Sequence, residues 1–288
     1  MRDIPTSPRI EKIKRENRKR FLRFLIFFLF LLIGLTIGVS YLSNNQHFII
    51  NDIKIEGTNI IDENDIKELV NKNISGKYFY LFNKSNSLIY PKNKIYKNLL
   101  TDFPRIEKLS IERNDWKSLK IKIKERAGSY LYCGTNIPDD ALQIGEDCYF
   151  VNNEGYIFDS APYFSGDIYL RFYTLLPKED ISPLGQSVID IDKWRKTIRF
   201  IDGVDNLGLK SVSVVLGSDG VNFIYLEKKQ GSSNPKIIWN DENDLQTLLE
   251  NFSLAMNKSE FANEIKDKYN TLSYIDLRFD NKVIYKFE

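Results

Sequence analysis

The residues best suited to chemistry are few in this sequence, and their spacing argues against the common catalytic centres. His47 is the only histidine among 288 residues, so a histidine-based triad and a histidine-rich metal site are excluded by count. One histidine and two cysteines also lack the ligand number and spacing of a zinc site. The G-x-S-x-G, Walker A and dinucleotide-binding glycine motifs do not occur. We therefore expect a binding protein that has no enzymatic activity and no cofactor, while catalysis by scattered carboxylates stays open.

Two groups of acidic residues could act as paired carboxylates, but each has a simpler interpretation. Asp139 and Asp140 lie between a proline and a glycine, which is typical of a solvated turn. Residues 241–244, Asp-Glu-Asn-Asp, precede an apolar stripe of helical spacing, where acidic side chains favour the helix dipole. We expect Asp241 to be the N-cap of that helix. Neither group predicts a catalytic site.

Two cysteines, Cys133 and Cys148, offer the remaining reactive side chains. Each lies beside a β-like run, and a polar loop joins the two runs. In an oxidising compartment a disulfide is expected to stabilise the fold by roughly 3 kcal/mol, because it closes this loop in the unfolded chain. Two unpaired small hydrophobic side chains are the equal alternative.

The N-terminal part has the pattern of a membrane anchor. Residues 1–23 carry nine basic and three acidic residues, whereas the rest of the chain is acidic on balance. A nucleic-acid-binding protein would spread positive charge over its folded part, so we expect no nucleic-acid partner. Residues 24–42 contain no charged side chain and span roughly 28 Å as a helix. The positive-inside rule then places residues 1–23 in the cytoplasm and the rest outside. A cleaved signal peptide is the alternative, with Gly38-Val39-Ser40 as its cleavage site.

A compact α+β module is predicted next, at about 50–125. Ile53 and Ile55 alternate with polar residues, as in a half-buried strand. Two later strands alternate in the same way, and the lysines of the second are expected on its solvent face. Between the first strand and this pair, two helices are predicted from an N-terminal signal and an apolar stripe: Asp62 before Ile66, Leu69 and Val70, and Pro91 before Ile95, Leu99 and Leu100. The predicted order is β-α-α-β-β.

The second part, at about 126–288, is predicted to be a mainly antiparallel β domain with flanking helices. Its signals are alternating strand runs separated by turns, with helices at 191–201 and around 245–252. A hairpin is expected at 148–158 around Asn152-Asn153-Glu154. A second hairpin, 273–287, is expected to turn at Asp280-Asn281.

Four segments in this order, behind the single apolar span, resemble the FtsQ/DivIB family of bacterial cell-division proteins. Residues 53–59, Ile-Lys-Ile-Glu-Gly-Thr-Asn, are similar to the opening of the family's POTRA domain. Phe103-Pro104-Arg105-Ile106 with 119–126, ending in Glu125-Arg126, is similar to its last strands. Residues 148–158 resemble the family's "yfvd..G.vf" segment, and 274–279 its terminal "DLR" strand. The sequence departs from the family pattern at Ala127-Gly128 and across 163–187.

The resemblance implies a divisome scaffold at the division septum, without enzymatic activity. Its partners would be small bitopic division proteins of the FtsB and FtsL type, bound outside the cytoplasm, while the POTRA-like domain would contact other division proteins. In the family the partner adds a strand to the β domain near its C-terminus, a mode called β-augmentation. A last strand suits this mode, because one row of its backbone groups is left unpaired. The expected partner-binding residues are Tyr274, Asp276, Leu277, Arg278, Phe279, Lys282, Val283, Ile284 and Tyr285.

Within this set, Arg278 and Lys282 are expected to be exposed rim charges, so charge reversal there would weaken docking without abolishing it. Two other functions remain alternatives. One is an anchored exported enzyme acting on the cell wall. The other is a POTRA-bearing factor for protein assembly or secretion.

Overall fold

The computed structural model describes residues 8–135, 147–164, 166–178, 181–228, 234–279 and 282–288. These form two compact units. Unit 1 comprises residues up to Asp102 together with Lys108–Lys124, and unit 2 comprises Phe103–Glu107 together with Glu125–Glu288. The predicted turns at Asp139-Asp140 and Asp280-Asn281 lie outside the described residues.

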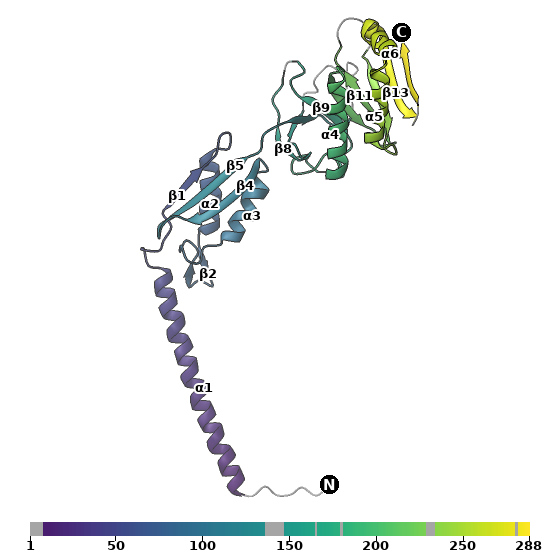
Figure 1. Ribbon diagram of the computed structural model, residues 1–288. Helices are drawn as coiled ribbons and strands as arrows, with labels where there is room; N and C mark the ends of the chain where they lie inside the picture. The colour runs from purple at the N-terminus through teal and green to yellow at the C-terminus, as the bar shows by residue number, and fades with distance from the viewer. Residues whose placement is uncertain (1–7, 136–146, 165, 179–180, 229–233, 280–281) are drawn as a thin grey trace, which may run out of the picture. The chain divides into compact units, whose positions relative to one another are not determined.

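The first element of unit 1 is the long helix α1, Pro8–Ser43 (Figure 1). From Arg15 to Ser43 it is long and apolar enough to cross a membrane, with a mean hydropathy of 2.5 over its most apolar stretch. None of that stretch is buried in the protein, which is expected of a helix whose apolar side chains face lipid. A membrane-anchoring helix fits both its composition and its exposure.

The rest of unit 1 is an α+β module. Its elements are β1 (Asp52–Glu56), α2 (Glu63–Ile74), β2 (Lys77–Tyr78), β3 (Phe82–Asn83), α3 (Lys92–Asp102), β4 (Ile106–Arg113) and β5 (Ser118–Glu125). The longer ones follow the predicted order β-α-α-β-β, and the short β2–β3 pair lies between the helices. β5 is the central strand of the sheet β1-β5-β4 and pairs with β1 in parallel.

The buried side chains of this module follow the predicted periodicities. Ile66 and Val70 of α2, Ile95 and Leu99 of α3, and Leu119, Ile121 and Ile123 of β5 form its interior. Lys122 and Lys124 alternate with them on the exposed side of β5, as predicted. The Asp62 carboxylate caps α2 by accepting from the Asn64 N–H at 2.8 Å. Gly57 has φ +91°, and a Cβ there would lie 2.0 Å from the Ile123 carbonyl oxygen, so only glycine fits this turn.

Unit 2 is built on a mixed sheet. Among the described residues, nine strands follow the order β14-β13-β12-β11-β10-β9-β6-β7-β8. The strands are β6 (Tyr130–Tyr132), β7 (Tyr149–Val151), β8 (Ile157–Ser160), β9 (Leu170–Thr174), β10 (Ser211–Leu216), β11 (Val221–Leu226), β12 (Lys236–Asn240), β13 (Leu272–Phe279) and β14 (Lys282–Phe287).

Helices pack on the sheet and close the core of unit 2 (Figure 1). They are α4 (Ile191–Asn206), α5 (Leu245–Met256) and α6 (Ser259–Asp267), followed by a 3₁₀ turn at Tyr269–Thr271. Alternate strand residues such as Val214, Ile224 and Ile275 share one buried cluster with Trp194 of α4 and Phe252 of α5. Gly155 (φ +79°) marks the turn between β7 and β8, where a Cβ would lie 2.8 Å from the Trp194 ring.

The expectations for unit 2 hold in part. Most of its strand pairs are antiparallel, as predicted, but the pairs β6–β9, β9–β10 and β12–β13 are parallel, so the sheet is mixed. β9 and α6 were not predicted. The N-cap of α5 is Asp244, which accepts from the Gln246 N–H at 3.2 Å, and not Asp241, which lies one turn earlier and bonds elsewhere.

Candidate interface at the end strand of the sheet

β14 ends the sheet of unit 2. In the described part of the chain its one strand neighbour is β13, with Tyr274 opposite Lys286 and Asp276 opposite Ile284. An antiparallel end strand presents its second row of backbone N–H and C=O groups away from the sheet. The arrangement can therefore accept a further strand at β14.

The side chains of β14 alternate between helix and solvent. Val283, Tyr285 and Phe287 are half-buried, and Lys282, Ile284 and Lys286 are exposed. On the inner side the Tyr285 ring lies 5.0 Å from the Phe261 ring of α6, measured between centroids. These contacts fix β14 on the unit, so its outer edge is presented by a strand that is already in place.

A small charged cluster continues this inner contact. The Tyr285 hydroxyl donates to Glu264 Oε2 at 2.8 Å, and Lys268 Nζ donates to Glu264 Oε1 at 2.9 Å. The hydrogen bonds from Lys268 and then Tyr285 lower the pKa of Glu264, and the bond to Glu264 raises the pKa of Tyr285. Glu264 and Tyr285 are half-buried and Lys268 is exposed, and the cluster links α6 to the end strand.

The predicted residues on β13 do not lie at the edge. At Tyr274, Ile275 and Asp276, β13 pairs with β12 on one side and with β14 on the other, so its backbone there cannot accept a further strand. Leu277 is 2% exposed and belongs to the core. Tyr274 is half-buried, and Phe279 is exposed at the end of the strand. Of the predicted set, the edge itself is formed by Lys282, Val283, Ile284 and Tyr285.

Arg278 is not the free rim charge that the sequence predicts. Its Nε lies 2.9 Å from Asp276 Oδ1 and its Nη2 lies 2.6 Å from Asp276 Oδ2, while its backbone N–H also donates to Oδ1 at 3.0 Å. The Asp276 residue is 5% exposed. Burial alone would raise the pKa of Asp276, but the hydrogen bonds and charge of Arg278 outweigh it, so the pKa is lowered. Arg278 therefore neutralises a buried carboxylate.

A cavity of about 370 Å³ adjoins the hairpin and was not predicted. α5 and α6 line it on one side, and the residues of β13 and β14 line it on the other. Several large apolar side chains on or beside it are exposed, among them Leu254 (64%) and Phe279 (49%). The helical spacing of Phe261 and Ile265 could have predicted α6, which lines part of this cavity.

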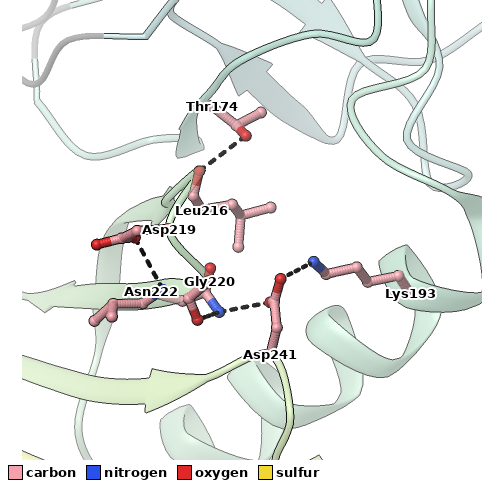
Figure 2. A network of polar contacts seen from close by, with 8 residues as sticks. Thr174, Lys193, Leu216, Asp219, Gly220, Asn222 and Asp241 are labelled. Carbon is pink, nitrogen blue, oxygen red and sulfur yellow. Dashed lines mark hydrogen bonds and ion pairs between the residues drawn. The ribbon is translucent and has the colours of Figure 1, made fainter.

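The acidic segment before α5 has a structural role (Figure 2). Asp241 Oδ2 accepts from Lys193 Nζ at 2.6 Å, and Asp241 Oδ1 accepts from Asn222 Nδ2 at 2.8 Å. The Asp219 side chain accepts from the Val221 N–H in the neighbouring turn. Asp241 thus ties the start of α4 to the β10–β11 hairpin. Within the described ranges, no group of three or more His, Cys, Asp or Glu side chains is arranged to hold a metal ion.

The two cysteines are joined. Cys133 and Cys148 form a disulfide with their Cα atoms 4.3 Å apart. The bond links the residue after β6 to the residue before β7, at one end of that antiparallel pair. Of the two alternatives that the sequence leaves open, a disulfide or two unpaired cysteines, the structure has the disulfide.

No protein-family model matches the chain, and no curated protein matches its sequence. The geometry of the end strand and the sequence resemblance are therefore the grounds for assigning a function.

Proposed function

We propose that the protein is a membrane-anchored scaffold of the FtsQ/DivIB type, without enzymatic activity, that captures a bitopic division protein by adding the partner's strand to β14. The observation that carries the proposal is the position of β14 as the end strand of the sheet, held on its inner side by Tyr285. Main-chain hydrogen bonds would supply affinity there, and the exposed Lys282, Ile284 and Lys286 would select the partner.

The proposed partners are proteins of the FtsB and FtsL type, and the proposed place of action is the division septum. The long apolar helix supports the anchoring part of this proposal. The membrane-proximal module of unit 1 is the proposed contact for other division proteins. Deleting residues 50–125 would test this contact poorly, because it also removes Arg105, whose Nε donates to Asp159 Oδ2 of unit 2 at 2.6 Å.

Proline at adjacent positions of β14 tests the docking edge. Backbone N–H groups alternate in direction along a strand, so of Val283 and Ile284 one donates toward β13 and the next points outward. Proline removes this donor. At the outward position we expect affinity for the partner pair to fall by about tenfold or more in a folded protein. At the inward position the hairpin itself is expected to open.

The measurement is the affinity of the purified full chain for an FtsB–FtsL pair, with circular dichroism to confirm folding. Ile284→Ala is the matched control for the side chain, because it shortens that side chain and keeps the backbone donor; the further loss in the proline variant then reports the backbone. Folded proline variants that all bind as tightly as the parent would place the docking edge elsewhere. Truncation after Phe279 is a weaker test, because it also removes Val283, Tyr285 and Phe287 from their packing against the core.

A further inference from the structure

The short hairpin β2–β3 carries aromatic residues in an unusual backbone conformation. Tyr78 pairs with Phe82, and the Leu81 N–H donates to the Tyr78 carbonyl at 3.0 Å, which closes a turn. The two central residues, Phe79 and Tyr80, have φ of 48° and 63°, as a type I′ turn requires. Asn and Gly are preferred there, because a bulky side chain is strained at positive φ. Strain of this kind is typical of functional positions.

Hydrogen bonds fix this hairpin to the last turn of α1. The Leu81 carbonyl accepts from Ser40 Oγ at 2.9 Å and from Asn44 Nδ2 at 3.1 Å. The Asn83 N–H donates to Ser43 Oγ at 2.7 Å. Ser40 and Ser43 lie at the end of the apolar run. The hairpin is therefore held beside the point where α1 would leave the apolar layer of a membrane.

The tip of the hairpin is apolar and almost fully exposed. Phe79 is 86% exposed, Tyr80 94% and Leu81 48%. Aromatic side chains of this kind concentrate at the level of lipid headgroups, where the ring is apolar and the tyrosine hydroxyl stays hydrated. Lys77 precedes the tip and is exposed, and the long aliphatic stem of lysine lets its ammonium group reach the phosphates, while Lys84 Nζ lies 5.5 Å from the centroid of the Tyr78 ring.

We propose that Phe79, Tyr80 and Leu81 insert into the interface of the bilayer that α1 crosses, so that the hairpin binds lipid and holds the module of unit 1 against the membrane surface. The inference rests on the proposed anchoring by α1. It does not depend on strand capture at β14, which lies in the other unit.

A fluorescent label at the tip tests this proposal in the full chain. Tyr80→Cys is labelled with a thiol-reactive nitrobenzoxadiazole dye without reductant, and Cys133 and Cys148 stay unlabelled because they are bonded to each other. The chain is reconstituted in phosphatidylethanolamine–phosphatidylglycerol vesicles that contain lipids spin-labelled near the top of the acyl chain. We expect a blue-shifted emission and strong quenching. Asp65→Cys is the matched control. The 12-residue helix α2 leads to the hairpin at its C-terminal end, and Asp65 lies near its other end, so a label there should be far from the tip and stay unquenched.

A second change keeps the turn and removes apolar surface. In the Tyr80→Cys background, Phe79→Asn suits positive φ better than phenylalanine does, so a loss of quenching cannot come from a broken turn. We expect that loss.

Four outcomes would overturn the inference. If the chain is integrated in the vesicles but the label at position 80 stays unquenched, the inference fails and the proposed anchoring by α1 stands. Quenching that matches the Asp65→Cys control also overturns it. A chain that washes off the vesicles at alkaline pH overturns both the inference and the proposed anchoring. A label that becomes buried only when the FtsB–FtsL pair is added would assign the tip to a protein partner instead.

Discussion

At the scale of single residues, Asp276 and Arg278 show how the predicted partner strand serves the fold. The side chain of Asp276 is 7% exposed and that of Arg278 is 36% exposed. Removing the guanidinium takes the side-chain donors and the positive charge from a buried carboxylate and leaves the backbone N–H of residue 278, which costs about 2 kcal/mol of stability. We expect Arg278→Ala to lower the free energy of unfolding of unit 2 by about that amount, as measured by hydrogen exchange. Lys282→Ala, at an exposed position of the next strand, is the control and should change it by less than about 0.5 kcal/mol.

The same pair gives a pH dependence with a defined sign. The pKa of Asp276 is lower in the folded protein than its ordinary value near 4. Its contribution to stability is therefore complete above about pH 4 and is lost as the pH falls through the lowered folded pKa. The difference between the parent and Arg278→Ala should shrink over this acidic range. A difference that stays constant there would show that packing, and not charge, connects the two residues.

At the scale of elements, the disulfide closes one end of the antiparallel pair formed by two short strands, β6 and β7. β6 and β7 have three residues each, and 15 positions separate their cysteines. Closing a loop of this length stabilises a fold by roughly 3 kcal/mol in the chain-entropy account. The double variant Cys133→Ser/Cys148→Ser is expected to lose about this much from unit 2, with unit 1 unchanged as the internal control. Hydrogen exchange reports the two units separately, and equal losses in both would contradict a local role.

The elements that the sequence predicts are those in which periodicity and an end signal agree. α2 has both an N-cap at Asp62 and buried residues at helical spacing, and β5 alternates without interruption. β9 was missed because Arg171 is buried inside it, 1% exposed, beside Tyr173 in a strand with both faces covered, which gives no alternation. A short helix such as α6, with no side-chain cap at Lys258, lacks a start signal.

The candidate site was predictable in part, for a related reason. Alternation along 282–287 correctly predicts a strand with one inner and one outer face. Strand order is set by contacts between distant segments, so the parallel pairing of β13 with β12 could not be read from either strand. Leu277 was chosen as a contact residue from this strand, but its side chain is 2% exposed and belongs to the core. Asp241 and Asp244 are equally plausible caps by residue type, and only the position of Lys193 and Asn222 assigns Asp241 to its network.

At the scale of the whole molecule, the end of α1 connects topology with the fold of unit 1. Cleavage of a signal peptide after Gly38-Val39-Ser40 would remove Ser40, which donates to the Leu81 carbonyl. It would also leave Ser43 without the helix that positions its hydroxyl for the Asn83 N–H. A segment that takes part in the packing of the mature module is better explained as a retained anchor than as a discarded leader.

Reporter fusions test the orientation of this anchor. By the positive-inside rule we expect the basic residues before the apolar run to stay in the cytoplasm, so alkaline phosphatase should be active when fused after Glu288 and inactive when fused before Met1. A matched variant reverses the bias by replacing the eight basic residues of 9–23 with glutamine, which leaves Arg2, and adding Asn45→Lys and Gln46→Lys. Its C-terminal reporter is expected to lose activity, because the basic flank then lies on the other side of the span. N-terminal sequencing of the membrane fraction completes the test: a chain that begins near Tyr41 would establish cleavage, and the hairpin at Phe79 and Tyr80 would then have no anchor beside it.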